Sequence, residues 1–190
     1  MTTLKLITAP VEYPITSAQV QEHLRLSDAE VAALSGTIAL LISEATRFVE
    51  DYTWRALVTQ EWEYHLDEWP DTRTIRLPKP PLQSVEGVFY TLDGESEAEF
   101  EDYHVDTDSE PGRIVLERNA SWPAGTLSPA NPIRIAFACG YPDGEEEGDP
   151  PQVEPRIIQA MLLRVTEMYS GVNLRNTIDN ILVNYRVMRF

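Results

Sequence analysis

The 190-residue sequence has one cysteine, Cys139, and therefore can form no disulfide bond within the chain. A metal site built from several cysteines is excluded for the same reason. Cys139 ends an apolar stretch at residues 136–139, where we expect a buried and inert thiol. The three histidines lie far apart, and none has a second histidine at metal-binding spacing. We therefore expect no metal and no cofactor.

The common catalytic sequence motifs are also missing. The chain contains no G-x-S-x-G, no P-loop and no G-x-G-x-x-G pattern. These absences favour a protein that is not an enzyme. One alternative is an acidic hydrolase, because a catalytic carboxylate pair could lie among the 31 Asp and Glu residues. Nothing in the sequence selects such a pair.

Long apolar runs are missing as well. The longest, around residues 38–42, is interrupted by Ser43 and Glu44, so we expect no segment that crosses a membrane. The first residues lack the basic start and apolar core of a signal peptide. We therefore expect synthesis in the cytoplasm and no membrane partner.

Positive charge is scarce, because 15 Lys and Arg face 31 Asp and Glu and leave a net charge of −16. Most of the excess lies in two segments, 91–110 with nine acidic residues and no basic one, and 143–149 with five acidic residues. Specific DNA binding needs clustered basic residues, so DNA near this protein should pass without being bound. The segments are either solvated loops or an acidic channel or loop surface. The candidate residues are Glu95, Glu97, Glu99, Glu101, Asp102, Glu145, Glu146 and Glu147.

Two capping boxes predict two helices near the start of the chain. Thr16 with Gln19 begins a short helix that ends near residue 26. Ser27 with Glu30 begins a longer one, whose apolar residues recur every three or four positions to about residue 53. We expect a bend or an interruption in it near position 35, where a serine precedes a glycine. Residues 1–14 are expected to form an extended arm.

After residue 57 the apolar period changes to two, which indicates strands. Short strands separated by turn residues favour an antiparallel sheet, because parallel strands need long crossover connections. The expected strands cover residues 58–66, 74–77, 85–91, 103–106, 113–117 and 133–139. Three prolines within residues 77–85 remove backbone donors and stiffen the chain, so this segment is expected to be the turn of a projecting β arm.

The C-terminal part carries a further helix, from Pro155 to about residue 170, with Gly171 as its C-cap. Residues 172–190 then hold three arginines against one aspartate and many apolar residues. They form either a final element packed on its own domain or an arm that docks on a partner. The candidate docking residues are Arg175, Ile181, Leu182, Tyr185, Arg186, Arg189 and Phe190.

These elements predict an α+β fold. A single domain over residues 1–171 would pack the N-terminal helices (16–53) and the C-terminal helix (155–170) together. A central antiparallel β insertion (57–140) would lie between them in sequence. An extended C-terminal arm (172–190) would follow.

The order of elements resembles the head–tail connector proteins of tailed bacteriophages, also called adaptor or head-completion proteins. Two motifs that carry it are Asp-Glu-Trp-Pro at 67–70 and Leu-Pro-Lys-Pro-Pro-Leu-Gln-Ser-Val at 77–85. Trp54 departs from the family pattern, where a glycine is usual, and Cys139 stands where a smaller residue is expected. The other matching segments are 14–18, 22–26, 45–57, 103–106, 111–114, 122–123, 138–141 and the helix from 155 to 169.

The resemblance implies a structural virion protein of the neck, made in the host cytoplasm. Such proteins form a ring, usually a dodecamer, beneath the portal after DNA packaging. The ring extends the DNA channel and offers a surface to the tail or to a stopper protein. The C-terminal segment would reach into the portal protein. A stopper or a tail-completion protein of the same region is the nearest alternative.

Overall fold

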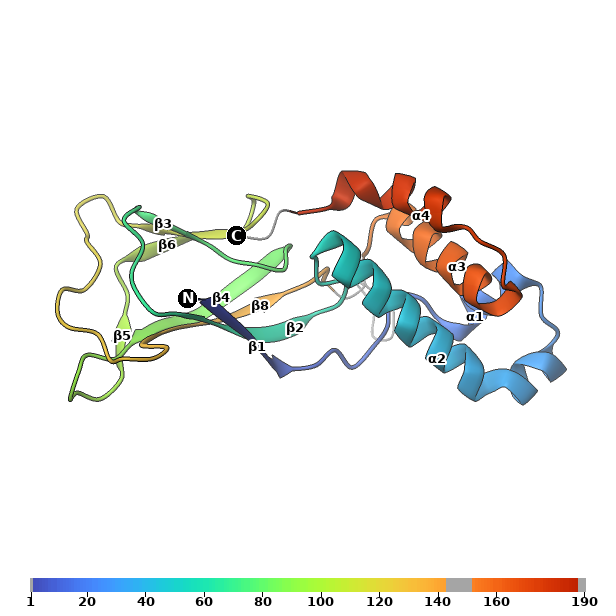
Figure 1. Ribbon diagram of the computed structural model, residues 1–190, viewed down its shortest axis with the longest axis horizontal. Coiled ribbons are helices and arrows are strands. Elements are labelled where there is room, and N and C mark those ends of the chain that lie inside the picture. Colours follow the sequence, from blue (N-terminus) through green and yellow to red (C-terminus); the bar gives the residue numbers. More distant parts are fainter. Residues whose placement is uncertain (1, 143–151, 188–190) are drawn as a thin grey trace. The chain divides into compact units, whose positions relative to one another are not determined.

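The computed structural model describes residues 2–142 and 152–187, and the chain divides into two compact units (Figure 1). The β unit comprises residues 1–10 and 59–140, and the helical unit comprises residues 11–58 and 141–190. The predicted α+β class is confirmed, because the described part of the chain contains helices and antiparallel sheets. The β insertion expected over 57–140 begins two residues before the longer segment of the β unit, 59–140, and ends at the same residue.

The β unit contains two antiparallel sheets. The five-stranded sheet has the order β1-β2-β8-β4-β5, and the three-stranded sheet has the order β3-β7-β6. The strands of the larger sheet are β1 (Thr2–Thr8), β2 (Gln60–Leu66), β8 (Ile133–Cys139), β4 (Leu82–Tyr90) and β5 (Ala98–Phe100). Those of the smaller sheet are β3 (Thr74–Arg76), β7 (Arg113–Leu116) and β6 (Tyr103–Asp106). The predicted bounds of β6 and β8 are confirmed.

The first strand was not expected. Residues 2–8 are extended, as predicted, but they pair with β2 as the edge strand β1, which the prediction of an extended arm did not include. The alternation of Leu4, Leu6 and polar residues fits a strand, but its partner lies about sixty residues away in the sequence. Strand β5 was also missed, because its three residues are too few to show a period.

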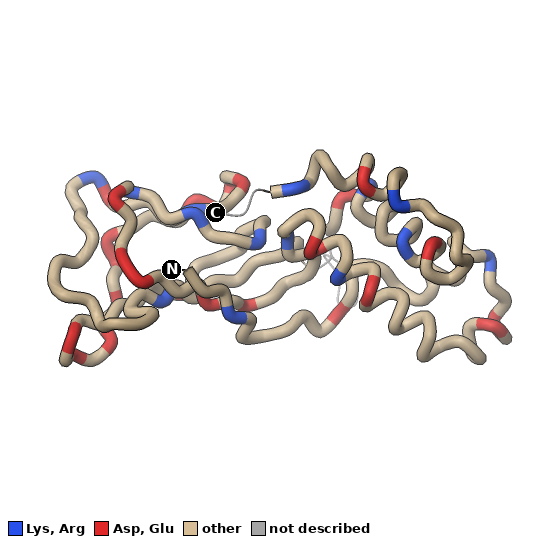
Figure 2. Tube along the Cα trace, viewed as in Figure 1, with Lys and Arg blue, Asp and Glu red and all other residues tan. Residues whose placement is uncertain are grey.

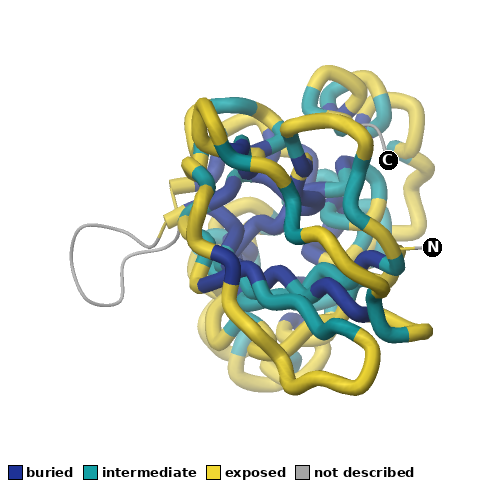
Figure 3. The backbone as a smooth tube through the Cα atoms, turned by 90° about the vertical axis from the view of Figure 1, so that its left-hand side faces the viewer, coloured by how far each residue is buried: buried dark blue, intermediate teal, exposed yellow. Residues whose placement is uncertain are grey.

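Alternating burial along the strands builds the core of the β unit. On β8, Ile133, Ile135, Phe137 and Cys139 are buried, while the residues between them are half-buried. One face of the larger sheet is therefore apolar and the other is partly polar. In Figure 3, exposed loops surround these buried strands. The expected burial of Cys139 is confirmed.

The proline-rich segment after β3 is buried rather than projecting, so the prediction of a protruding β arm is wrong. Leu77, Pro78, Lys79 and Pro80 are all buried. The backbone N–H of Leu77 donates to the carbonyl of Gly112 over 2.8 Å, and the Lys79 ammonium lies 5.7 Å from the centre of the Trp62 ring. The segment connects a strand of one sheet to a strand of the other.

The helical unit consists of α1 (Ser17–Leu24), α2 (Asp28–Thr53), α3 (Pro155–Ser170) and α4 (Arg175–Leu182), and the 3-10 turn Val183–Tyr185 follows α4. Both predicted capping boxes are confirmed. At the start of α1, the Gln19 N–H donates to Thr16 Oγ1 over 3.2 Å, and the Thr16 N–H donates to Gln19 Oε1 over 2.8 Å. Helix α2 runs without the interruption expected near position 35.

Two helix ends explain residues singled out in the sequence. Gly171 caps α3 with a φ of 74°, as predicted. Trp54 caps α2 with a φ of 60°, in the left-handed region that glycine adopts without steric cost. This backbone conformation fits the glycine that the resemblance leads us to expect at this position.

The apolar sides of the four helices share one core. It includes Ile38, Ile42 and Val49 of α2, Ile157, Met161 and Val165 of α3, and Ile178 and Leu182 of α4. Because residues 175–185 are helical and partly buried in this core, the prediction of an extended C-terminal arm is wrong for them. Leu174, Ile178, Ile181, Leu182 and Tyr185 recur at helical spacing, which explains why the segment folds back.

Helix α2 is long and apolar enough to cross a membrane when judged by length and composition alone. Core helices of other proteins meet the same criterion. Its inward side packs in the core of the helical unit, although only 22% of the apolar window is buried. Packing within the helical unit therefore explains why the inward side of α2 is apolar, but it does not explain why the outward side is apolar as well.

Candidate functional site

The candidate acidic residues that the structure describes lie around the edge strand β5. Glu95, Glu97, Glu99, Glu101 and Asp102 are all exposed. Figure 2 shows acidic residues in this part of the β unit. The structure thus brings these five residues to one edge of the larger sheet. Glu145, Glu146 and Glu147 lie outside the described residues.

The polar face of the larger sheet carries a row of ion pairs that joins three strands, β1, β2 and β8, and ends beside β5. Lys5 Nζ on β1 lies 3.4 Å from Glu63 Oε2 on β2. Arg134 on β8 contacts Glu63 Oε1 at 3.5 Å through Nη1 and Glu97 Oε2, beside β5, at 2.7 Å through Nη2. The Arg134 guanidinium also lies 4.1 Å from the centre of the Phe89 ring on β4. Arg134 is therefore the centre of this charged face.

These contacts shift the pKa values of the carboxyl groups. Arg134 donates hydrogen bonds to Glu97 and lowers its pKa below the ordinary value, although burial opposes this effect. Burial would raise the pKa of Glu63, but the hydrogen bond with His65 and the charges of Lys5 and Arg134 outweigh it, so the pKa is lowered. Both groups are therefore firmly ionised at neutral pH.

A third carboxyl group with a lowered pKa, that of Asp106, lies on the smaller sheet. Asp106 accepts a hydrogen bond from Ser109 Oγ over 2.7 Å and another from Arg113 Nε over 2.7 Å. Together these bonds lower the pKa of Asp106 to about 2. In the described part of the chain, every carboxyl whose pKa departs from its ordinary value is lowered. A general acid of a hydrolase needs the opposite shift.

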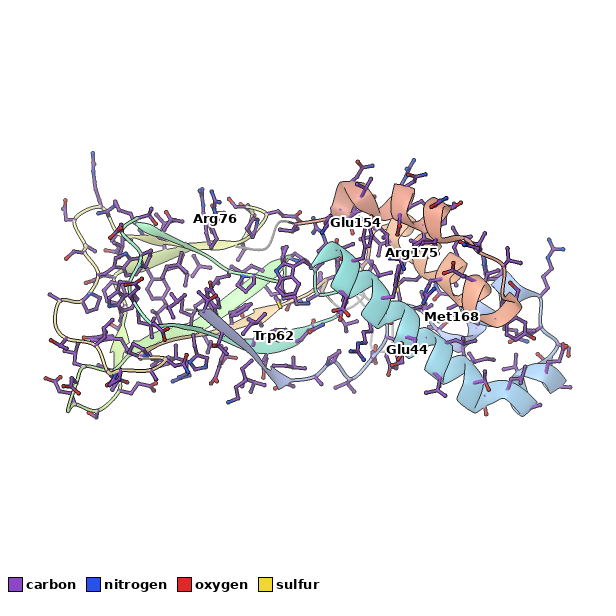
Figure 4. The ribbon with its side chains drawn as sticks, viewed as in Figure 1. Glu44, Trp62, Arg76, Glu154, Met168 and Arg175 are labelled. Atoms are coloured by element: carbon purple, nitrogen blue, oxygen red, sulfur yellow. The ribbon has the colours of Figure 1, made fainter. Side chains whose placement is uncertain are left out.

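The candidate docking residues that the structure describes lie on α4 and directly after it. Arg175 (Figure 4) pairs with Asp179 at 3.1 Å, and its guanidinium lies 4.5 Å from the centre of the Phe48 ring. The Arg186 guanidinium lies 5.9 Å from the centre of the Tyr52 ring. Both arginines therefore lie over aromatic rings of α2.

The other members of this set are less accessible. Leu182 is fully buried, and Ile181 and Tyr185 are half-buried against the helical core. Arg189 and Phe190 lie outside the described residues. The structure thus separates the set into an anchored part, up to Tyr185, and an exposed Arg186 that follows it.

An open hollow of about 350 Å³ lies in the helical unit between the segment before α1 and the side of α2. The sequence did not predict this hollow. The helical period shows which side of α2 faces the core, but it does not show that residues 12–17 lie beside the helix. Leu40 of α2 is 68% exposed, and Tyr13 is 45% exposed. The hollow is lined by Glu12, Tyr13, Ile15, Thr16, Ser17, Ala39 and Ile42.

Metal and cofactor chemistry find no support in these surfaces. Within residues 2–142 and 152–187, no group of three or more His, Cys, Asp or Glu side chains is placed to hold a metal ion. The carboxylates of Glu97 and Asp106 contact arginine and serine side chains instead. What the described surfaces offer is charge on the β unit and apolar area on the helical unit.

Three solved structures resemble the chain over its whole length. A chain in the neck of the empty gene transfer agent (GTA) particle, computed with C6 symmetry, is 19% identical with a TM-score of 0.79. A chain in the virion of the native GTA particle is 19% identical with a TM-score of 0.76. A chain in the neck of the native GTA particle, computed with C12 symmetry, is 18% identical with a TM-score of 0.73. Each match covers 99% of this chain and 97% of the other.

The chain has the fold of a particle-neck component. This finding agrees with the resemblance to head–tail connector proteins, and at 18–19% identity it concerns the fold. No protein-family model matches the sequence, and no curated protein does either.

Proposed function

We propose that this chain is a structural protein of the neck of a tailed-phage-like virion. Its copies would form a ring between portal and tail that extends the DNA channel and completes the head after packaging. The observation that carries the proposal is the fold match, which leaves almost no part of either chain unmatched. Neck structures computed with C6 and C12 symmetry support a ring, and a dodecamer is compatible with both.

The electrostatics support passage of DNA without capture. The chain has a net charge of −16, and the acidic residues around β5 are exposed. The Lys and Arg side chains of the polar sheet face are paired with carboxylates, so they offer little free positive charge to a phosphate backbone. A channel lined by such a surface repels DNA and lets it slide.

The end of the chain is the proposed contact with the portal protein. Ile178 and Leu182 anchor α4 in the core, and the exposed Arg186 follows this anchor directly. Arg189 and Phe190 come next in the sequence. An anchored helix that is followed in the sequence by two arginines and an aromatic residue has the composition of an interface hot spot.

The proposed role is structural, without catalysis. Glu63, Glu97 and Asp106 have lowered pKa values and engaged oxygens, so they are poor general acids. This argues against the acidic hydrolase that the sequence left open.

A reconstruction of whole particles that contain this chain would test the position. We expect its density in a ring that contacts the portal on one side and the tail on the other. Density that contacts only the tail would favour a stopper or tail-completion protein. Absence of the chain from the neck would overturn the proposal.

Portal binding can be tested with purified portal rings and the full chain. The triple variant Arg186→Ala, Arg189→Ala, Phe190→Ala should bind at least about a hundredfold more weakly, because hot-spot side chains carry most of the binding energy. Arg118→Ala, which removes an exposed arginine of the β unit, is the matched control and should bind normally. Normal binding by the triple variant would refute this use of the chain end.

A further inference from the structure

The larger sheet ends in two edge strands, β1 and β5. In the described part of the chain, no strand pairs with the outer side of either one (Figure 1). Strand β1 is seven residues long, and all of its residues except Leu4 are exposed. An edge strand presents backbone donors and acceptors along its outer side and readily adds a further strand. The two edges are therefore the places where this sheet can be extended.

Strand β1 is poorly protected against such pairing. It contains no proline and no acidic residue, and Lys5 is its only charged residue. Leu6 is 42% exposed and Ile7 is 48% exposed. Its one irregularity is a bulge between Leu6 and Thr8. Because proteins usually shorten, charge or cover an edge strand, we expect another strand to cover β1 in the assembled protein.

Acidic and apolar residues alternate along the opposite edge. Strand β5 consists of Ala98, Glu99 and Phe100, and its neighbours in the sequence are Glu97 and Glu101. Phe100 is buried, whereas Glu99 is exposed. A period of two places the carboxylates on one face of the sheet and the apolar side chains on the other. The β5 edge therefore offers carboxylates on one face only.

The residues of β1 match this pattern on both faces. One row of cross-strand partners crosses the whole sheet: Leu4, Tyr64, Ile135, Val88 and Phe100. Leu4 and Phe100 therefore lie on the same, apolar face. Lys5 and Glu99, their neighbours in the sequence, lie on the polar face. A sheet that continued from β5 of one copy to β1 of another would keep both faces and would bring Lys5 near Glu99.

Lys5 is able to bind a second carboxylate. It is one of two lysines in the sequence, and its side chain is 65% exposed, whereas Lys79 is buried. Its partner Glu63 is shared with Arg134 at 3.5 Å and with His65 at 3.3 Å. One carboxylate thus faces three basic groups. The β1 edge therefore has a basic side chain to offer in a chain that is strongly acidic.

We propose that β1 of one copy pairs with β5 of the next copy, so that the larger sheets of neighbouring copies join into one sheet. The inference rests on the proposed function, in which the copies form a ring. Each copy has a net charge of −16, and no acidic residue occurs before Glu12. Repulsion between copies is therefore weakest where the β1 edge of one meets the acidic β5 edge of another.

The topology of the sheet determines how the two strands meet. Each strand of the larger sheet is antiparallel to its neighbours, so β1 and β5, the first and the fifth, run in the same direction. Copies in a ring are related by rotation, and the two strands would therefore pair in parallel. The contact joins two different edges, so it is heterologous and can repeat from copy to copy. Because β5 has only three residues, one such contact is weak, and a closed ring holds each copy on both sides.

Carbodiimide coupling tests the contact directly, because it joins a lysine amine to a carboxylate that touches it. Necks isolated from particles that contain this chain should yield peptides in which Lys5 is linked to Glu99. This link can only join two copies, since three strands separate β1 from β5 within one copy. The link of Lys5 to Glu63, whose atoms lie 3.4 Å apart within one copy, is the internal control.

Charge reversal tests the same contact with the full chain in solution. Lys5→Glu and Glu99→Lys each bring like charges together at the contact. Each should weaken self-association, measured by analytical ultracentrifugation, by about tenfold. Glu117→Lys makes the same charge change as Glu99→Lys at an exposed position beside the smaller sheet, and this control should associate like the wild type.

An equimolar mixture of the two variants is the sharper test. Every contact between a Lys5→Glu copy and a Glu99→Lys copy joins opposite charges, so the mixture should associate like the wild type. Mixing would not repair a fold defect caused by loss of the pair between Lys5 and Glu63. Rescue by mixing therefore separates the contact between copies from the stability of each copy, and circular dichroism should show that both variants are folded.

Two results would overturn the inference. One is a neck in which the link of Lys5 to Glu63 forms and the link to Glu99 does not. The other is a mixture that associates no better than the single variants. A ring in the neck without the link to Glu99 would refute the contact alone, whereas association rescued by mixing, with no copy in the neck, would refute the proposed function alone.

Discussion

The indole rings of Trp69 and Trp122 stack in parallel, with centroids 4.9 Å apart and planes inclined by 4°. Trp122 also donates from Nε1 to the carbonyl of Thr72 over 2.8 Å. Phe100 packs against both indoles at 6.0 and 5.6 Å. This aromatic cluster holds the connection between β7 and β8 against the segment that follows β2. It therefore stabilises a part of the β unit that has few backbone ladder bonds.

Loss of this stack should destabilise the protein. We expect Trp122→Ala to lower the free energy of unfolding by about 2–3 kcal/mol, the sum of lost apolar burial and lost ring stacking. Urea denaturation followed by circular dichroism measures this. Trp122→Phe keeps an aromatic ring and should retain more than half of the lost stability. Equal losses for both variants would show that the stack contributes nothing.

Gly112 is expected to tolerate no side chain. A Cβ at this position would lie 2.3 Å from the Cβ of Leu82, which is a severe overlap in a packed region. Gly112→Ala should therefore cost about 1–3 kcal/mol of unfolding free energy. Gly36→Ala is the control, because its Cβ would meet nothing within 4 Å, and it should stabilise α2 by up to about 1 kcal/mol. Thermal unfolding of both variants measures these changes in stability. A Gly112→Ala variant as stable as the wild type would contradict the predicted overlap.

Arg134 should make stability depend on acid pH. Arg134→Met keeps the apolar stem over Phe89 but removes the charge, so the pKa values of Glu97 and Glu63 should rise. We expect a loss of about 1 kcal/mol at pH 7, small because water screens the exposed Glu97.

The sign follows from the lowered carboxyl pKa values. The stabilisation is present above the unfolded pKa of about 4.3 and is lost as pH falls through the lower folded values. Wild type and variant should therefore differ at pH 7 and converge as the pH falls below the lowered folded pKa values of the two glutamates. NMR titration of the two glutamates and urea unfolding at several pH values measure this. A stability difference that persists at a pH where the NMR titration shows both glutamates protonated would rule out the ion pairs as its cause.

Helix α4 should be part of the folded core, which makes truncation at residue 171 harmful. Ile178 is fully buried, and Ile178→Ala should cost about 2–5 kcal/mol. Asn180→Ala, two residues away and exposed, should change stability by less than about 0.5 kcal/mol. Removal of residues 172–190 should expose apolar core surface, and the truncated chain should therefore bind the dye ANS. A truncated chain with wild-type stability would show that this segment is a dispensable arm.

Local signals in the sequence determined most of the helices and several strands. The capping boxes at Thr16 and Ser27 specified where α1 and α2 begin, because a side chain three residues away satisfies the first backbone donors. The short apolar segment at residues 133–139 indicated β8, and Gly171 marked the end of α3. The acidic character of the chain and the family resemblance followed from composition and from the order of short motifs.

Only the tertiary structure decided what depends on contacts between distant residues. It placed residues 2–8 at the edge of a sheet and buried the proline segment after β3. It folded residues 175–185 back on α2 and α3. Arg134 met Glu97 and Glu63 only through strand pairing across a sheet. Periodicity shows that one side of a segment is apolar but does not name the partner that covers it, and that partner is what separates a docking arm from a core helix.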